Sequence, residues 1–75
     1  MRSYHAKSYS VQARRMGNSI FDEFLALIES GAKIDEAEKY LMKVINNSYR
    51  HKLVKGRAAA RFGKKVREYK RKRGI

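Results

Sequence analysis

Apolar residues recur every three or four positions after residue 18, the spacing that places side chains on one face of a helix. The first such stretch is NSIFDEFLALIESG, and Asn18 or Ser19 is placed to cap its start. Gly31 follows it and can adopt the left-handed conformation that ends a helix. We predict a well-buried helix over residues 19–30, with a broad apolar stripe formed by Ile20, Phe21, Phe24, Leu25, Leu27 and Ile28.

A second stretch, KIDEAEKYLMKVINNSYRHKLVKG, opens with Asp35 and Glu38 at the spacing of a capping box. Weak helix formers at residues 46–48 could break this helix and let Ser48 cap a new one. Because the apolar period runs through them, we predict one continuous helix over residues 35–55. Its apolar positions are Ala37, Leu41, Val44, Ile45, Tyr49 and Leu53.

A third apolar stripe follows Gly56, which is expected to end the second helix or to form a hinge within it. The stripe is narrow and predicts a helix over residues 57–72. Gly63 lies inside this helix and weakens it by about 1 kcal/mol relative to Ala. The residues of the stripe are Ala59, Phe62, Val66 and Tyr69.

These three helices predict an all-α fold, in which residues 19–30 and 35–55 form a hydrophobic hairpin. Residues 1–17 show no firm period, so we expect a basic N-terminal arm ahead of a single helical domain over residues 18–75. The best-buried side chains are expected to be Phe24, Leu25, Ile28, Leu41, Val44 and Ile45.

The expected hairpin is marginal, because in a chain of 75 residues the apolar burial barely offsets the entropy lost on ordering. Either the third helix folds back over the hairpin, or a second copy of the chain covers its open face. Since symmetric dimers are the commonest assembly, we predict a homodimer.

Charge is distributed very unevenly along the chain, whose net charge is +12. Residues 1–17 carry four bases and no acid, residues 18–48 three bases and six acids, and residues 49–75 twelve bases and one acid. The net charges of these blocks are +4, −3 and +11. A near-neutral middle with a basic end is expected when folding and binding belong to different parts of a chain. The C-terminal block is therefore the expected binding surface.

Several kinds of chemistry are disfavoured by the sequence. In GRAAARFGKK, six residues separate Gly56 from Gly63, and a second lysine stands where a phosphate-binding loop needs Ser or Thr. His5 and His51 have no partner at metal-ligand spacing. The acid clusters lie in the first turns of predicted helices, where capping explains them. We expect no enzyme activity, no cofactor and no metal.

The chain has no cysteine and no apolar run long enough to span a membrane. The lack of cysteine fits a reducing compartment, so we expect a cytoplasmic location, or a nucleoid or nuclear one for a DNA-binding protein. An anionic membrane surface is a poor partner, because the stripe of the third helix is narrow and rich in alanine. No membrane contact is expected.

The segment RHKLVKGRAAARFGKKVREYKRKRG, residues 50–74, carries like charges that would repel one another in an isolated helix. Only Glu68 can relieve Lys64 and Lys72 at helical spacing. Such repulsion is sustained most easily when a polyanion neutralises it, and phosphate oxygens suit arginine forks and lysine charges. We therefore predict a small nucleic-acid-binding protein, regulatory or architectural, whose contacts are Arg57, Arg61, Lys64, Lys65, Arg67, Lys70, Arg71, Lys72 and Arg73.

Composition does not separate DNA from RNA, because an arginine-rich helix can enter the DNA major groove or a widened RNA groove. DNA is slightly favoured. Tyr4 and Tyr9 are interleaved with bases on the predicted arm and are candidates for stacking on nucleobases. The alternative function is an adaptor or inhibitor whose basic helix lies in the acidic groove of a protein partner, with Phe62 and Tyr69 as anchors.

Overall fold

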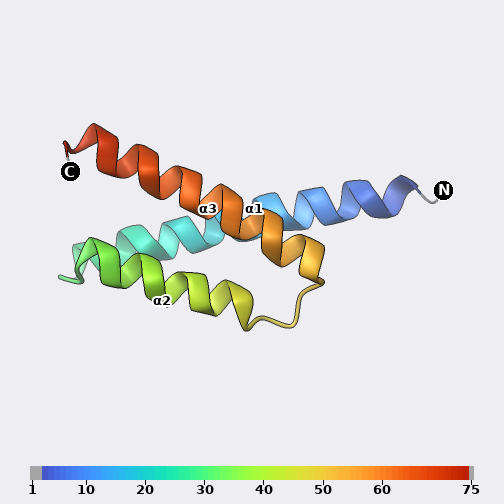
Figure 1. Cartoon of the computed structure of the whole chain (residues 1–75), viewed down its shortest axis with the longest axis horizontal. Coiled ribbons are helices and arrows are strands. Elements are labelled where there is room, and N and C mark those ends of the chain that lie inside the picture. Colours follow the sequence, from blue (N-terminus) through green and yellow to red (C-terminus); the bar gives the residue numbers. More distant parts are fainter. Residues whose placement is uncertain (1–2, 75) are drawn as a thin grey trace.

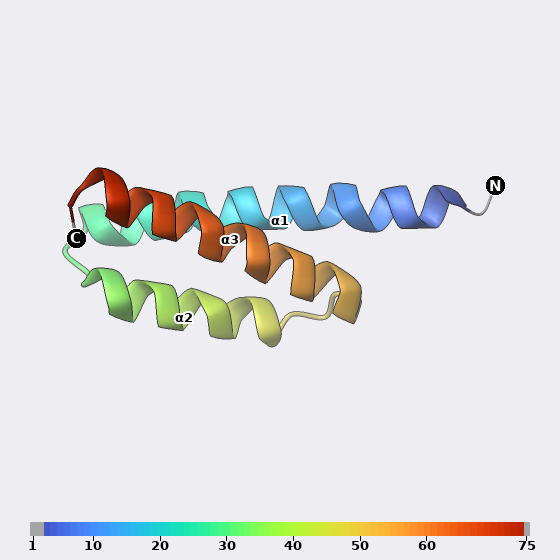
Figure 2. The same ribbon diagram turned by 45° about the horizontal axis from the view of Figure 1, so that its top comes forward.

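Three helices make up the fold, in a computed structural model that describes the backbone of residues 3–74 and the side chains of residues 8–74. They are α1 (Ser3–Glu29), α2 (Ile34–Asn46) and α3 (Lys52–Lys72). Residues 3–74 contain no strand, so the predicted all-α fold is confirmed. α2 runs back along α1, and α3 then crosses both (Figure 1, Figure 2). The N-terminal part of α1 extends past the ends of the other two helices (Figure 2).

α1 begins at Ser3, so the prediction that the first helix starts at residue 19 is wrong. Small buried residues continue the apolar stripe towards the N-terminus, since Gly17 and Ala13 lie one and two turns before the buried Ile20. A search for large apolar side chains misses such positions. Residues 8–17 of the predicted basic arm are helical, whereas the side chains of residues 1–7 lie outside the described residues, and an arm there stays a prediction.

The predicted continuous helix over residues 35–55 is also wrong, because α2 ends at Asn46 and α3 begins at Lys52. The Ser48 hydroxyl donates a hydrogen bond of 2.8 Å to the carbonyl of Ile45, which competes with continuation of the helix. The Nδ1 atom of His51, rather than Ser48, caps α3 by accepting a 3.1 Å hydrogen bond from the backbone N–H of Leu53.

The apolar period that favoured continuity does not mark a buried face in this connection. Tyr49 is fully exposed and Leu53 is 47% exposed. Gly56 lies within α3, where it neither ends nor hinges a helix. The apolar spacing of four positions therefore continues through the loop by coincidence. The weak helix formers at residues 46–48 end α2 instead.

The turn between α1 and α2 confirms one predicted helix end and corrects a predicted helix start. Gly31 has a φ of 106°, the left-handed conformation expected of a terminator. The N-cap of α2 is Lys33, which makes no side-chain capping bond, so the predicted capping box of Asp35 and Glu38 does not form. These two acids, near the start of α2, form ion pairs with Lys70 of α3 instead.

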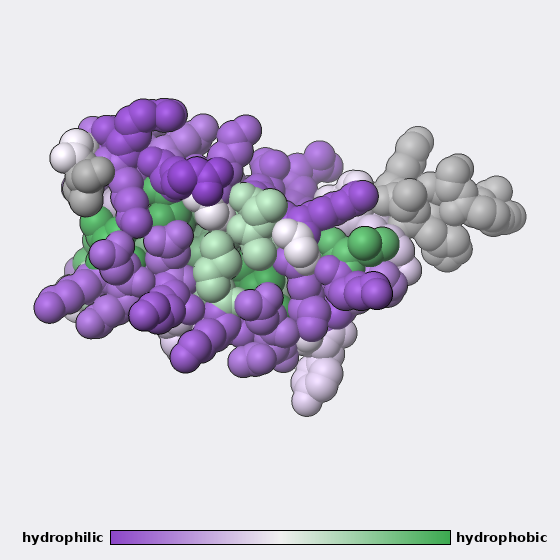
Figure 3. Space-filling view, viewed as in Figure 1, coloured by the Kyte–Doolittle hydropathy of each residue, from purple (hydrophilic) through white to green (hydrophobic). Residues whose placement is uncertain are grey.

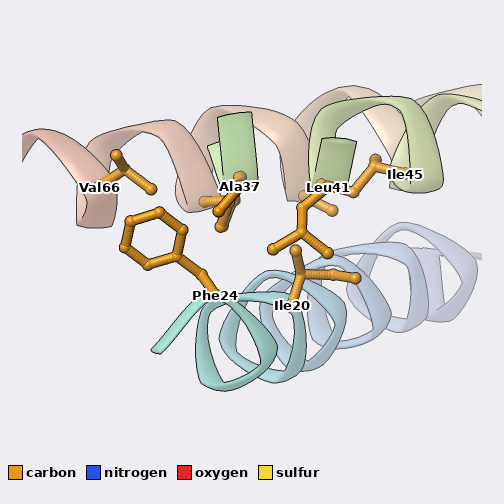
Figure 4. Packing of buried hydrophobic residues seen from close by; sticks show 8 residues of the cluster. Ile20, Phe24, Ala37, Leu41, Ile45 and Val66 are labelled. Carbon is orange, nitrogen blue, oxygen red and sulfur yellow. The ribbon is translucent and has the colours of Figure 1, made fainter. Parts of the chain in front are cut away.

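The hydrophobic core lies where α3 covers the pair of helices formed by α1 and α2. Figure 4 shows Phe24 rising from α1 towards α2 and α3. Its ring packs edge-on against Phe62, at 5.9 Å between centroids, and against Tyr69, at 5.4 Å. The buried cluster consists of Ile20, Phe24, Ala37, Leu41, Ile45, Ala58, Phe62 and Val66.

Burial of Phe24, Leu41 and Ile45 is confirmed, since each side chain is inaccessible to solvent. Ile28 and Val44 are only partly buried, and Leu25 is 37% exposed, so those three predictions are wrong. Ile28 and Val44 pack against the buried cluster, to which α3 contributes Ala58, Phe62 and Val66. α3 supplies the cover that a second copy was expected to give. The homodimer itself stays a prediction.

Candidate nucleic-acid interface

Acidic residues gather at one end of the molecule. Six of the seven lie between Asp22 and Glu38, at the end of α1 and the start of α2. The C-terminal end of α3 lies at this same end (Figure 1). No acid occurs in residues 1–21 or 39–67. The opposite end, with the connection over residues 47–51 and the start of α3, is therefore the cationic one.

Lys70 is the basic residue most fully neutralised by these acids. Its Nζ lies 3.2 Å from Asp35 Oδ1 and 3.2 Å from Glu38 Oε1. Hydrogen bonds to Asp35 and then to Glu38 raise the pKa of Lys70 above its ordinary value of 10.5. Lys70 was predicted to bind phosphate, but in this structure its charge ties α3 to α2.

Arg73, at the C-cap of α3, is held in a similar acidic setting. Its guanidinium lies 4.8 Å from the centre of the Tyr69 ring. It also lines a shallow hollow together with Asp22 and Glu29. A phosphate approaching Arg73 would meet these carboxylates, so this end of the predicted site is poorly suited to a polyanion.

Two arginines in the first half of α3 contact α1. Arg57 donates a 2.7 Å hydrogen bond from Nη1 to the hydroxyl of Ser10. Arg61 donates a 3.0 Å hydrogen bond from Nε to Oδ1 of Asn18. A Cβ built on Gly17 would lie 3.1 Å from the Cβ of Arg61, so glycine is what lets the Arg61 stem pack on α1. Neutral partners orient both guanidiniums and leave their charge uncompensated.

These contacts frame a hollow between α1 and α3, here named the arginine hollow. It has a volume of about 180 Å³ and is lined by Ser10, Ala13, Arg14, Arg57 and Arg61. Three of its five lining residues are arginines from two helices, and none is acidic. Converging guanidinium groups with free N–H donors can bind phosphate oxygens in pairs.

Further bases continue from the arginine hollow along α3. Arg61 also lines a neighbouring hollow with Lys64, Lys65 and Glu68. Lys65 packs its ammonium 5.2 Å from the centre of the Phe21 ring. The remaining predicted site residues are exposed, and they are Arg67, Arg71 and Lys72. Hydrophilic side chains cover most of the face of the molecule seen in Figure 3.

The structure thus brings Arg57, Arg61, Lys64 and Lys65 of the predicted site together on the α1 side of α3. The sequence-based prediction missed Arg14, which comes from α1. A signal for it existed in the acid-free N-terminal block, but the helical period there was not recognised. The predicted stacking residue Tyr9 packs on His51 at 4.7 Å between ring centroids, and the side chain of Tyr4 lies outside the described residues.

No protein-family model matches this chain, and no curated protein or solved structure is detectably similar to it. Among the described residues, no three His, Asp or Glu side chains are grouped as metal ligands. None of the three helices has the length and apolar character needed to cross a membrane. Function then has to be inferred from the charge and geometry of the chain itself.

Proposed function

We propose that this chain is a small nucleic-acid-binding protein that holds the phosphate backbone in the arginine hollow and along the adjoining face of α3. The observation that carries the proposal is the convergence of Arg14, Arg57 and Arg61 on one hollow that no carboxylate lines. Like charges at such close range raise the free energy of the folded chain. A bound polyanion removes that cost and gains paired hydrogen bonds.

Two features favour a nucleic acid over a single phosphate group. The arginine hollow is open and continues through Arg61 into a hollow where three bases outnumber one acid, Glu68, which suits a chain of phosphates. The bases beyond it repeat along one exposed helix face. Release of counterions by several such contacts gives binding that weakens steeply with salt.

The proposal is tested by measuring the anisotropy of fluorescent DNA and RNA between about 50 and 200 mM salt. Arg14→Gln with Arg57→Gln removes two charges from the arginine hollow. The matched control, Arg71→Gln with Lys72→Gln, removes two charges near the acidic end. The hollow variant should flatten the slope of log K against log salt by about 1.4 to 1.8, and the control by less than half as much.

Two results would overturn the proposal. One is the absence of micromolar binding to either nucleic acid at low salt, which would favour an acidic protein as the partner of the same bases. The other is an equal loss of slope in both double variants, because the arginine hollow would then have no special part. Circular dichroism should show the same helix content in both variants, since all four replaced residues are exposed.

A further inference from the structure

The connection between α2 and α3 presents an aromatic ring that the fold does not use. Tyr49 has a relative exposure of 106%, so both faces of its ring are open to solvent. The other tyrosines with described side chains are less exposed, and Tyr9 and Tyr69 pack on other aromatic rings. A ring held in this way is free to stack on a planar partner.

The surroundings of Tyr49 are cationic. Arg50 and Lys52 lie one and three residues after it, and it belongs to the acid-free segment 39–67. Lys55 reaches back to the end of α2, donating a 3.0 Å hydrogen bond to the carbonyl of Asn46. A planar partner of Tyr49 is therefore expected to carry negative charge, and a nucleobase joined to phosphates has both properties.

Contacts with one turn of α1 hold this connection close to the arginine hollow. Arg50 donates a 3.2 Å hydrogen bond to Oε1 of Gln12, and His51 stacks on Tyr9. Ser10, between these two α1 residues, lines the hollow and accepts from Arg57. The two residues that follow Tyr49 and the arginines of the hollow thus contact the same segment of α1.

We infer that the ligand is a single-stranded nucleic acid, with an unpaired base stacked on Tyr49 while neighbouring phosphates occupy the arginine hollow. The inference rests on the proposed function and narrows its ligand. In a duplex the faces of the bases are covered by their neighbours, so only an unpaired strand offers one to an exposed ring. Neither stacking nor phosphate contact reads the sugar, so DNA and RNA strands should both bind.

The test compares three probes of equal length: a single DNA strand without self-complementarity, its duplex, and a strand of abasic sites that keeps the phosphates. The single strand should bind at least about fivefold more tightly than the abasic strand, because stacking of one base contributes that much. Tyr49→Ala should abolish this preference and leave binding of the abasic strand and the duplex unchanged. The salt slope should also stay unchanged, since no cation is removed.

Two variants serve as controls. Tyr49→Phe keeps the ring and should bind as the original protein does. Tyr40→Ala removes another exposed tyrosine, from α2, and should have no effect. Equal binding of all three probes, with no change in Tyr49→Ala, would overturn the inference and leave the proposed function standing. Failure to bind any probe at low salt would overturn both.

Discussion

The two halves of α3 differ in how much of their charge is free. The C-terminal half, residues 62–72, carries six bases against four in residues 52–61, yet it is the half that acids from other helices approach. Asp35 and Glu38 neutralise Lys70, whereas Arg57 and Arg61 donate hydrogen bonds to the neutral side chains of Ser10 and Asn18. Which bases are available to a ligand therefore depends on long-range contacts that the density of charge along the sequence does not show.

Both halves of α3 depend on one core, so the largest expected effect is on stability. Phe62 lies at the junction of the halves, inaccessible to solvent, and packs on Phe24 of α1. Phe62→Ala should lower the free energy of unfolding by about 3 to 5 kcal/mol, as measured by chemical denaturation followed by circular dichroism. In a chain of this size that is a large part of the total stability.

Leu25→Ala is the control for the loss of Phe62. Leu25 is 37% exposed on α1, so its replacement should cost about 1 kcal/mol or less. If Phe62→Ala cost no more than Leu25→Ala, α3 would not be docked through this core. The two halves of α3 would then not be held against α1 by the same core.

The second prediction concerns the acids that neutralise the C-terminal half. Asp35→Asn with Glu38→Gln frees Lys70 at a modest cost in stability, because Asp35 is largely exposed and the pair with Glu38 is only partly buried. If the freed charge gains one phosphate, affinity in about 100 mM salt should rise by up to roughly eightfold. The salt slope should steepen by up to about 0.9, in the anisotropy assay used for the arginine hollow.

A matched variant separates this effect from a general gain in positive charge. Glu23→Gln with Glu36→Gln removes two exposed acids for which no bond to α3 is seen, and it should raise affinity less. Equal gains in the two double variants would mean that net charge, rather than release of Lys70, sets the affinity. The difference between the halves of α3 would then lose its explanation.

The all-α class and half of the predicted core followed from the sequence, because they depend on local spacing. Phe24, Leu41 and Ile45 repeat with a helical period and lie in the core as that period predicts. Leu25 belongs to the same kind of stripe but is 37% exposed. Whether Leu25 is buried depends on where α3 crosses α1, and no local sequence pattern specifies that crossing.

The candidate site was predictable in type and only partly in membership. Arg57 and Arg61 could be identified from the basic segment, since no acid lies near them in sequence and none lines the arginine hollow. Lys70 shares that segment, but its partner Asp35 is 35 residues away along the chain. Arg14 joins the hollow for the same kind of reason, because packing of α1 on α3 brings it there. Long-range packing therefore determines which bases are neutralised, such as Lys70, and which line the arginine hollow, such as Arg14.

The smallest expected effect tests the assignment of Gly56 to the helix interior. Gly56 lies in α3 with ordinary φ, and a Cβ built there meets nothing within 4 Å. Gly56→Ala should therefore raise the free energy of unfolding by about 0.4 to 1 kcal/mol. Gly17→Ala should not raise the free energy of unfolding in this way, because its Cβ would lie too close to the Cβ of Arg61. That contact can be relieved only if α1 moves away from α3. Thermal unfolding of the two variants measures the difference, and a destabilised Gly56→Ala would show that the first half of α3 needs a hinge after all.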